Sequence, residues 1–287
     1  MSSRPPSILP DSEIVSPTGR MVAPLLARRD HDQPSLFRPE NMLREARRQK
    51  GLPPGRVPQI CVLDPDGDIV RHVRETQGAA AAPHWACYHT ELWDFAAQGT
   101  RFGIVGRAVG ASFAVLVAEE LFACGCELLI SITSAGQIAP IAPPPYHVVI
   151  ERALRDEGTS YHYLPPSRYA QGHSTLTALA AAAFAQAGRR TFVGASWTTD
   201  APFRETAETV AARQREGILT VEMEAAALYA FAEAQGRPVL CIAHVSNQLG
   251  CVEGDFEKGD GASAAIDLLV AFAAAWTCCE RTVACAE

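Results

Sequence analysis

Apolar and polar positions alternate with two different periodicities along most of this chain. Short apolar runs that suit buried strands are separated by longer stretches in which apolar residues recur at i, i+3 and i+4, the spacing of an amphipathic helix. Strands are predicted at residues 60–63, 102–105, 128–133, 146–151, 191–197, 218–221 and 239–243, and helices at 39–50, 111–124, 174–188, 206–215 and 262–276 among others. This alternation predicts an α/β fold of three layers, with a mixed, largely parallel central sheet flanked by helices.

The first 58 residues show neither of these periodicities over a long stretch. They are rich in Pro, Arg and Ser and contain one helical candidate at residues 39–50, where Pro39 and Glu40 suit a helix start. We expect residues 1–58 to form a partly irregular arm with one helix, and residues 59–287 to form a single α/β domain. The basic face of the helix is expected either to be solvated or to pack on a neighbouring subunit.

One junction between a strand and a helix is unusually informative, GILTVEMEAAALYAFAEAQG at residues 217–236. An apolar, β-branched run is followed by Glu222, Met223 and Glu224, and then by an Ala-rich helical pattern that ends at a glycine suited to the C′ position. The two glutamates are either exposed acids that favour a helix N-terminus or buried carboxylates that need partners.

Composition narrows the choice of function. Nearly half of the 287 residues are apolar, which is enough for a sizeable core, and the formal charge of −7 argues against a nucleic acid or an anionic membrane as the main partner. Nine cysteines, an odd number without any C-x-x-C pair, suggest reduced thiols rather than disulfides or a zinc site. The N-terminus lacks the apolar segment of a signal peptide, so we expect a cytoplasmic protein.

The loops that follow the predicted strands carry the candidate chemistry. In α/β sheets, ligands bind at the carboxyl ends of strands. Here those loops contain aspartates, small residues with one arginine, hydroxyl groups and amides, at residues 64–68, 106–112, 133–136, 198–204 and 244–248. The spacing of the histidines suggests no metal site.

The segment V-E-M-E-A-A-A-L resembles the ribose-binding signature of the nucleoside phosphorylase and nucleosidase superfamily. The resemblance extends from about residue 60 to residue 276 through weaker motifs in the same order: AVLVAEEL at 114–121, the strand end at 132–136, T-D-A-P-F at 199–203, and Ser246-Asn247. It implies a phosphorylase/hydrolase-like α/β fold and a nucleoside-like substrate. Family members also complete their sites with residues from a neighbour, so a homo-oligomer built on dimers is expected.

The resemblance assigns roles to particular residues. Met223 is expected to pack on the sugar, Glu224 to accept hydrogen bonds from the ribose 2′ and 3′ hydroxyls, and Ser134 to contact ribose and phosphate. Glu222 belongs to the same ribose-binding segment. The residues implied in base binding are Asp200, Phe203, Arg204, Asn247, Gln248 and Tyr163. Glu224 and Asn247 are the candidates for direct roles in catalysis.

The departures from the family pattern concern the anion and the leaving base. Gly67, Thr90 and Ser131 stand where family phosphorylases carry phosphate-binding arginines, and Arg107 is the best placed replacement for one of them. Asn247 stands where purine enzymes have a catalytic aspartate. An amide can hydrogen-bond a base but cannot act as a general acid.

These features together predict cleavage of the N-glycosidic bond of a nucleoside or related ribosyl compound. Phosphorolysis is the family default, and inorganic phosphate would be the co-substrate, with no cofactor and no metal. Hydrolysis by water is the first alternative, because the arginines are missing. A non-catalytic ligand-binding or scaffold protein that kept the fold is the second.

Overall fold

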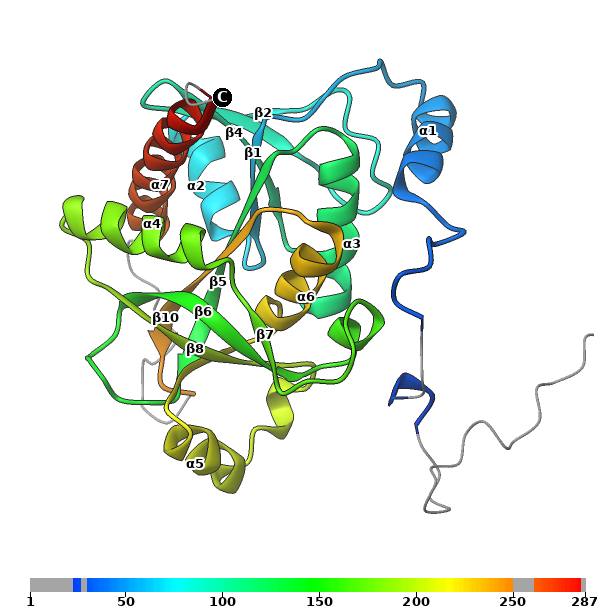
Figure 1. Cartoon of the computed structure of the whole chain (residues 1–287). Coiled ribbons are helices and arrows are strands. Elements are labelled where there is room, and N and C mark those ends of the chain that lie inside the picture. The colour runs from blue at the N-terminus through cyan, green and yellow to red at the C-terminus, as the bar shows by residue number, and fades with distance from the viewer. Residues whose placement is uncertain (1–22, 27–29, 250–260, 285–287) are drawn as a thin grey trace, which may run out of the picture.

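The computed structural model describes residues 23–26, 30–249 and 261–284. In this part of the chain the strands form one sheet and helices cover both of its faces (Figure 1). The strands are β1 (Ile60–Asp64), β2 (Ala80–Ala81), β3 (Trp93–Ala97), β4 (Thr100–Gly106), β5 (Leu128–Gln137), β6 (Tyr146–Asp156), β7 (Tyr169–Gln171), β8 (Thr191–Thr199), β9 (Ile218–Glu222) and β10 (Val239–Asn247). The helices are α1 (Pro39–Lys50), α2 (Asp68–Thr76), α3 (Ala111–Ala123), α4 (Ser174–Gln186), α5 (Ala207–Arg215), α6 (Ala225–Gln235) and α7 (Gly261–Ala284), with 3-10 turns η2 (Pro24–Leu26), η3 (Thr159–His162) and η4 (Pro202–Arg204).

The sheet has the strand order β10-β6-β8-β9-β5-β1-β4-β3-β2, and β7 pairs with β6. Strand β10 also pairs with β5, so β10, β6, β8, β9 and β5 form a closed ring of strands. Within the ring, β6, β8 and β9 run in the opposite direction to β5 and β10. The predicted α/β fold with a helix-flanked central sheet is confirmed. The sheet is mixed, with antiparallel pairs both inside the ring and at the β3 and β2 edge.

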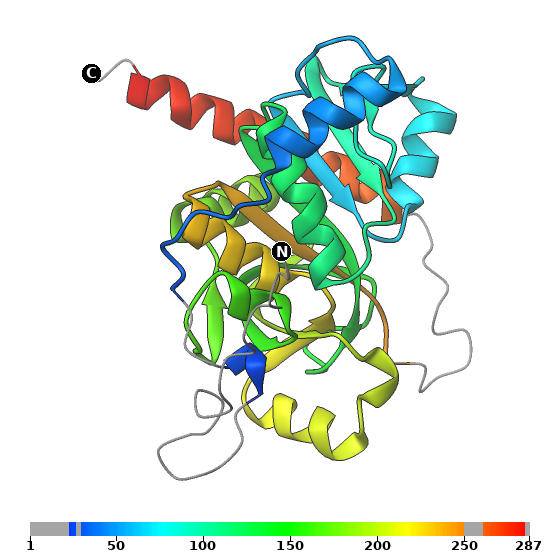
Figure 2. The same ribbon diagram turned by 90° about the vertical axis from the view of Figure 1, so that its right-hand side faces the viewer.

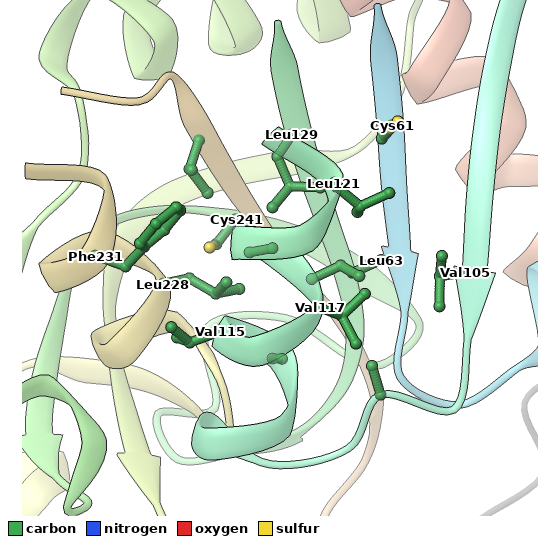
Figure 3. Close-up of a cluster of buried hydrophobic side chains, with 14 of the residues drawn as sticks. Cys61, Leu63, Val105, Val115, Val117, Leu121, Leu129, Leu228, Phe231 and Cys241 are labelled. Carbon is green, nitrogen blue, oxygen red and sulfur yellow. The ribbon is translucent and has the colours of Figure 1, made fainter. Parts of the chain in front are cut away.

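Two hydrophobic cores lie on the two faces of the sheet. On one face, α3 and α6 pack together, and α1 packs on α3 (Figure 1). Figure 3 shows this core, in which Leu121 of α3 and Leu228 of α6 lie over Leu63 of β1 and Leu129 of β5. On the other face, α7 packs against α2 and α4. The three predicted layers follow from these two apolar faces, because each helix layer buries a different side of the same strands.

The local predictions agree with most elements and miss the edges. The predicted helices are present, whereas the short strands β2, β3 and β7 were not expected. Strand β5 was expected to end at Thr133 and continues instead to Gln137. It does so because Ala135 and Gly136 still pair with β10, and Gly136 and Gln137 pair with β9 on the other side. The hydroxyl-bearing segment after Thr133 is therefore held in the sheet.

Helix α7 contains a stretch, Gly261–Cys279, that is long and apolar enough by length and composition to cross a membrane. Its Leu268, Leu269 and Phe272 are instead fully buried against the body of the protein. The last turns of the helix extend past that body (Figure 2). These contacts identify α7 as a core helix.

Candidate functional site

A cavity of about 300 Å³ lies where two sets of strand ends meet. The carboxyl ends of β5 and β10 approach it from one direction and that of β9 approaches from the other, with Gly136 opposite Val221. Its walls also include the loops after β1, β4 and β8. The lining residues are Pro65, Asp66, Val109, Thr133, Ser134, Gly136, Pro202, Phe203, Glu205, Val221, Glu222, Met223, Glu224, Asn247 and Leu249. The cavity therefore lies at strand ends, as expected from the sequence, but these ends approach it from two opposite directions.

Glu224 lies at the N-cap position of α6 and is 1% exposed. One carboxylate oxygen, Oε1, accepts a hydrogen bond from the Gly110 N–H at 2.7 Å, and Oε2 accepts from the Thr133 hydroxyl at 3.0 Å and the Met223 N–H at 3.3 Å. Burial raises the pKa of Glu224, and the nearby Glu222 raises it further. Donors from three separate segments thus fix this carboxylate at the edge of the cavity.

Glu222 lies two residues before Glu224 and makes a different set of contacts. Its Oε1 accepts hydrogen bonds from the hydroxyls of Ser196 at 3.0 Å and Thr198 at 2.6 Å. Its Oε2 accepts from the N–H groups of Glu224 at 2.8 Å and Ala225 at 2.7 Å. Four donors engage both oxygens, two from β8 and two at the start of α6. Glu222 therefore joins β8 to the N-terminus of α6 and positions Glu224.

Met223 lies between the two glutamates and is partly buried in the wall of the cavity. Because the Glu222 and Glu224 carboxylates accept from the backbone N–H groups around it, the backbone of Met223 is held at the cavity. An apolar wall beside an acceptor suits a ligand that has an apolar face and a hydroxyl edge.

Elsewhere in the cavity wall, Ser134 donates two hydrogen bonds to one carboxylate. Its N–H donates to Asp66 Oδ2 at 2.8 Å, and its hydroxyl donates to Asp66 Oδ1 at 2.7 Å. Asp64, at the end of β1, is buried and accepts a hydrogen bond from the Val70 N–H at 2.9 Å. Burial raises the pKa of Asp64 to about 7, and the nearby charges of Asp66 and Asp68 add to the shift. Of these two aspartates, Asp66 lines the cavity.

Arg107, which was expected to bind phosphate, lies over the loop that follows β1. Its backbone has φ of 65°, and its N–H donates to the Asp64 carbonyl at 2.9 Å. The side chain crosses Gly67, where an added Cβ would lie 3.1 Å from Arg107 Cγ. Gly67 itself has φ of 80°, which favours glycine. The exposed Arg107 side chain does not line the cavity, and it forms no ion pair with the described residues.

Of the six residues expected to contact the base, two line the cavity. Asn247 is 9% exposed, and its Oδ1 accepts from the Leu249 N–H at 3.1 Å. Phe203, in η4, is fully exposed at the cavity mouth. The other four residues are Asp200, Arg204, Gln248 and Tyr163, which do not contribute to the lining.

Two of these four have other contacts that explain their positions. Asp200 Oδ2 accepts from the Gly158 N–H at 2.8 Å and so holds the turn after β6. The hydroxyl of Tyr163 donates to Glu119 at 2.9 Å, and its ring packs edge-on against Phe231. Tyr163 thus lies between α3 and α6. Arg204 and Gln248 are exposed.

Glu205 lines the cavity and was not singled out from the sequence. Its side chain is about half-buried, and its carboxyl group makes no hydrogen bond or ion pair with the described residues. Burial raises the pKa of Glu205 to about 7. The only sequence signal was its position two residues after Phe203, where an acid before a helix is ordinarily a solvated residue. Asp66, Thr133 and the Gly110 N–H were also missed as parts of one site.

The described residues contain no group of three or more His, Cys, Asp or Glu side chains arranged to hold a metal ion. The donors and acceptors around the cavity are instead carboxylates, hydroxyls, an amide and backbone N–H groups. Such groups can bind a polyhydroxylated ligand and a polar ring.

Comparison with known proteins points to one family. The family model described as the Phosphorylase superfamily matches residues 59–275. The chain is 31% identical over 182 residues to a DeoD-type purine nucleoside phosphorylase from Roseobacter denitrificans, covering 61% of this chain and 78% of that protein. It is 28% identical over 197 residues to a guanosine phosphorylase from Halorubrum lacusprofundi, covering 68% and 76%.

Two further similarities concern uridine phosphorylases. The chain is 26% identical over 234 residues to that of Thermococcus kodakarensis, covering 75% of this chain and 79% of that protein. A crystal structure of the Vibrio fischeri ES114 protein, complexed with 6-hydroxy-1-naphthoic acid, superposes with a TM-score of 0.64 at 21% identity, covering 81% of this chain and 93% of that chain. The second likeness establishes the fold. The relatives are named for different bases, so similarity alone does not select one.

Proposed function

The chain belongs to the phosphorylase superfamily, and on that basis we propose that it is a nucleoside phosphorylase-like enzyme that breaks the N-glycosidic bond of a nucleoside by phosphorolysis. The observation that carries this proposal is the buried Glu224 carboxylate, held at the edge of the cavity beside Met223. A carboxylate fixed by donors from three segments is a preformed acceptor for a pair of vicinal hydroxyls.

Glu224 and Met223 are assigned to the ribose. Burial raises the pKa of Glu224 to about 8, while its three hydrogen-bond donors favour the ionised form. Ionised Glu224 would accept hydrogen bonds from the 2′ and 3′ hydroxyls, and Met223 would pack on the sugar. The Thr133 hydroxyl, which now donates to Glu224, can rotate to share the carboxylate with the substrate. Glu222 is assigned a positioning role, since both of its oxygens are already engaged.

Asn247, Phe203 and Glu205 are assigned to the base. When the bond from C1′ to the base nitrogen lengthens, the sugar becomes cation-like and negative charge develops on the base. Asn247 can donate a hydrogen bond to the base but cannot supply a proton. Glu205, whose pKa is raised to about 7, can be protonated near neutral pH and can donate that proton to the departing base. Phe203 can cover the ring at the cavity mouth.

Phosphate is assigned to the wall that contains Ser134. A phosphate oxygen would attack C1′ from the face opposite the base, forming the C1′–O bond as the C1′–N bond breaks. The products would be ribose 1-phosphate and the free base. Ser134 offers an N–H and a hydroxyl, and the Arg107 side chain, which crosses Gly67 nearby, is long enough to supply a guanidinium. No cofactor besides this co-substrate is proposed.

One observation favours hydrolysis as a second candidate function. The two Ser134 donors that would hold phosphate are engaged by the Asp66 carboxylate. A carboxylate at that position could also orient water toward C1′, and free ribose would then replace ribose 1-phosphate among the products.

We also propose that the protein is a cytoplasmic homo-oligomer built on dimers. Val109 and Leu116 are large apolar residues with about half their surface exposed, beside the cavity and on α3. The seven described cysteines form no disulfide with one another, which suits a reducing compartment. Sedimentation at micromolar concentration would test the dimer, and a monomer of the 30.8 kDa chain mass would contradict it.

A panel of purine and pyrimidine nucleosides, incubated with and without phosphate, tests the main proposal. We expect base release that depends on phosphate, together with ribose 1-phosphate. Equal base release without phosphate, accompanied by free ribose, would establish the hydrolytic alternative. No base release from any nucleoside, by a protein that still binds nucleosides, would leave the non-catalytic alternative.

A further inference from the structure

The loop after β1 places a carboxylate on the donors assigned to the co-substrate. Asp66 bonds to both the N–H and the hydroxyl of Ser134, at 2.8 and 2.7 Å. A carboxylate and a phosphate group are both anions with two or more oxygens that can accept hydrogen bonds from a pair of donors. Asp66 therefore has the geometry of a bound anion supplied by the chain itself.

Several charged side chains surround the contact between Asp66 and Ser134. Asp64, Asp66 and Asp68 lie within five residues, and all three line a small cavity together with Ser134 and Arg71. Arg71 forms an ion pair with Asp68 at 2.8 Å, so its charge is engaged one turn away. Arg107 lies across Gly67 without forming an ion pair with the described residues. A free phosphate approaching Ser134 would therefore meet a like charge before it meets a partner.

The position of Asp66 is also one that can change at low cost. Asp66 is exposed, whereas Ser134 is held in β5 by its neighbours. The following residue, Gly67, adopts a left-handed conformation that belongs to the turn and not to the sheet. An incoming anion can thus displace the carboxylate into solvent without unpairing a strand.

We propose that Asp66 is the residue that sets the affinity for the co-substrate: it competes with phosphate for Ser134 and must leave before phosphate binds. This inference rests on the proposed phosphorolytic function of the same site. Asp66 then determines which nucleophile is favoured, because phosphate must displace a charged group and water need not. Removing its charge is expected to strengthen phosphate binding, an effect opposite to that of removing a phosphate ligand.

Two variants and a matched control test the competition. Asp66→Asn keeps the size and removes the charge, and Asp66→Ala also opens the space in front of Ser134. Asp68→Asn removes the same charge two residues away, from a side chain that neither bonds to Ser134 nor lines the nucleoside cavity. The KM for phosphate should fall about tenfold in Asp66→Ala, the size expected when charge-assisted hydrogen bonds no longer compete. It should change less than twofold in the control, and the nucleoside KM should stay near that of the parent.

Direct binding of inorganic phosphate provides a readout independent of turnover. Thermal unfolding of each variant would be followed across a phosphate series in the absence of nucleoside, since a ligand that binds the native state raises the melting temperature. Asp66→Ala should be stabilised at lower phosphate concentrations than the parent. In Asp66→Ala combined with Ser134→Ala, most of this gain should disappear, because one of the two released donors has been removed.

Three results would overturn the inference. The first is an unchanged or weaker affinity for phosphate in Asp66→Ala, and the second is an equal gain in Asp68→Asn, which would reflect net charge alone. The third is loss of phosphate-independent base release in both Asp66 variants, which would make Asp66 the group that activates water. Absence of ribose 1-phosphate from every variant would contradict the proposed function instead, and the phosphate titration would still decide the role of Asp66.

Discussion

The two walls of the cavity differ in how firmly the surrounding structure holds them. At the junction of β9 and α6, Glu222 and Glu224 are buried, and donors from several elements engage both oxygens of each. At the junction of β1 and β5, an exposed Asp66 bonds to Ser134, and Arg107, which lies across Gly67, belongs to a third segment. The wall assigned to ribose is part of the folded core, whereas the wall assigned to the nucleophile depends on a surface loop.

This difference indicates which half of the site can change. Altering a buried carboxylate leaves donors without partners, at a cost of about 1–3 kcal/mol for each unsatisfied group. Altering an exposed loop residue usually costs within about 0.5 kcal/mol. A chain can therefore lose its anion-binding arginines while the sugar-binding segment stays intact. The following predictions test the contrast, from the largest expected effect to the smallest.

Glu224→Gln should reduce kcat/KM for nucleosides by about tenfold to a thousandfold, as expected when a charged hydrogen bond of about 1.5–3 kcal/mol or more is lost. The amide keeps the size of the carboxylate but exchanges one acceptor for a donor, which would face the Gly110 N–H or the Thr133 hydroxyl. Steady-state kinetics with the preferred nucleoside would measure the loss. Turnover equal to that of the parent would remove Glu224 from the ribose site.

Glu222→Gln should act first on folding. Its amide nitrogen would face either two hydroxyls or two N–H groups, so we expect a loss of about 2–3 kcal/mol in the free energy of unfolding. Urea denaturation would measure this, with the exposed Glu75→Gln as the control. If Glu222→Gln unfolds like the parent while activity falls as far as in Glu224→Gln, Glu222 contacts the substrate and is not merely a positioning residue.

Glu205→Gln should reduce kcat by roughly tenfold, toward the low end for a general acid because the amide still offers an N–H donor. The parent should lose activity as pH rises through about 7, the raised pKa of Glu205, because only the protonated form can donate. The variant should lack this alkaline limb. A pH profile of kcat from 5 to 9 would compare them, and identical limbs would assign the titration to another group.

The raised pKa of Glu205 should also make the stability of the protein depend on pH. In the native state Glu205 keeps its proton up to about pH 7, whereas in the unfolded state it releases the proton near its ordinary pKa of 4.5. Stability should therefore decline as pH rises between these values, and the full penalty should apply above pH 7. Glu205→Gln, which carries no ionisable proton, should lack this decline, so the gap between variant and parent should widen over that interval.

Arg107→Ala should give the smallest effect, raising the KM for phosphate about fivefold, the size of an exposed ion pair. Arg107→Lys keeps the charge and should remain within about twofold of the parent, and Arg101→Ala, on the preceding strand, provides an unrelated exposed arginine as control. The KM for the nucleoside should not change. A change in the nucleoside KM without any change for phosphate would move Arg107 out of the nucleophile wall.

The fold could be predicted from the sequence because the patterns that indicate helices and strands are local. Helical spacing and apolar runs are read within about ten residues, and each predicted helix is present. The V-E-M-E segment likewise predicted a carboxylate at a strand-to-helix junction, and Glu224 lies at the start of α6. Strand β5 was predicted too short because its last residues are held by pairing with β9 and β10, which local pattern does not contain.

The rest of the site could not be predicted because its contacts are distant in sequence. Asp66 and Ser134 are 68 residues apart, and Glu224 is 114 residues from Gly110. Glu205 resembles an ordinary acid before a helix until burial and the lack of a partner are known. An aromatic side chain in a loop suits packing as well as ligand binding, and the Tyr163 ring lies against Phe231.

The closed ring of β10, β6, β8, β9 and β5 determines how the molecule would come apart. Strands in a ring have no free edge from which pairing can be peeled away, whereas β2, a two-residue exposed strand, ends the open side of the sheet. Amide hydrogens of β5 and β9 should therefore exchange with solvent only in rare, nearly global openings, and those of β2 and β3 in frequent local ones. Because β5 and β9 belong to the ring, the wall assigned to ribose would be among the last regions to lose its shape when the protein is stressed, whereas the loop after β1 lies outside the ring.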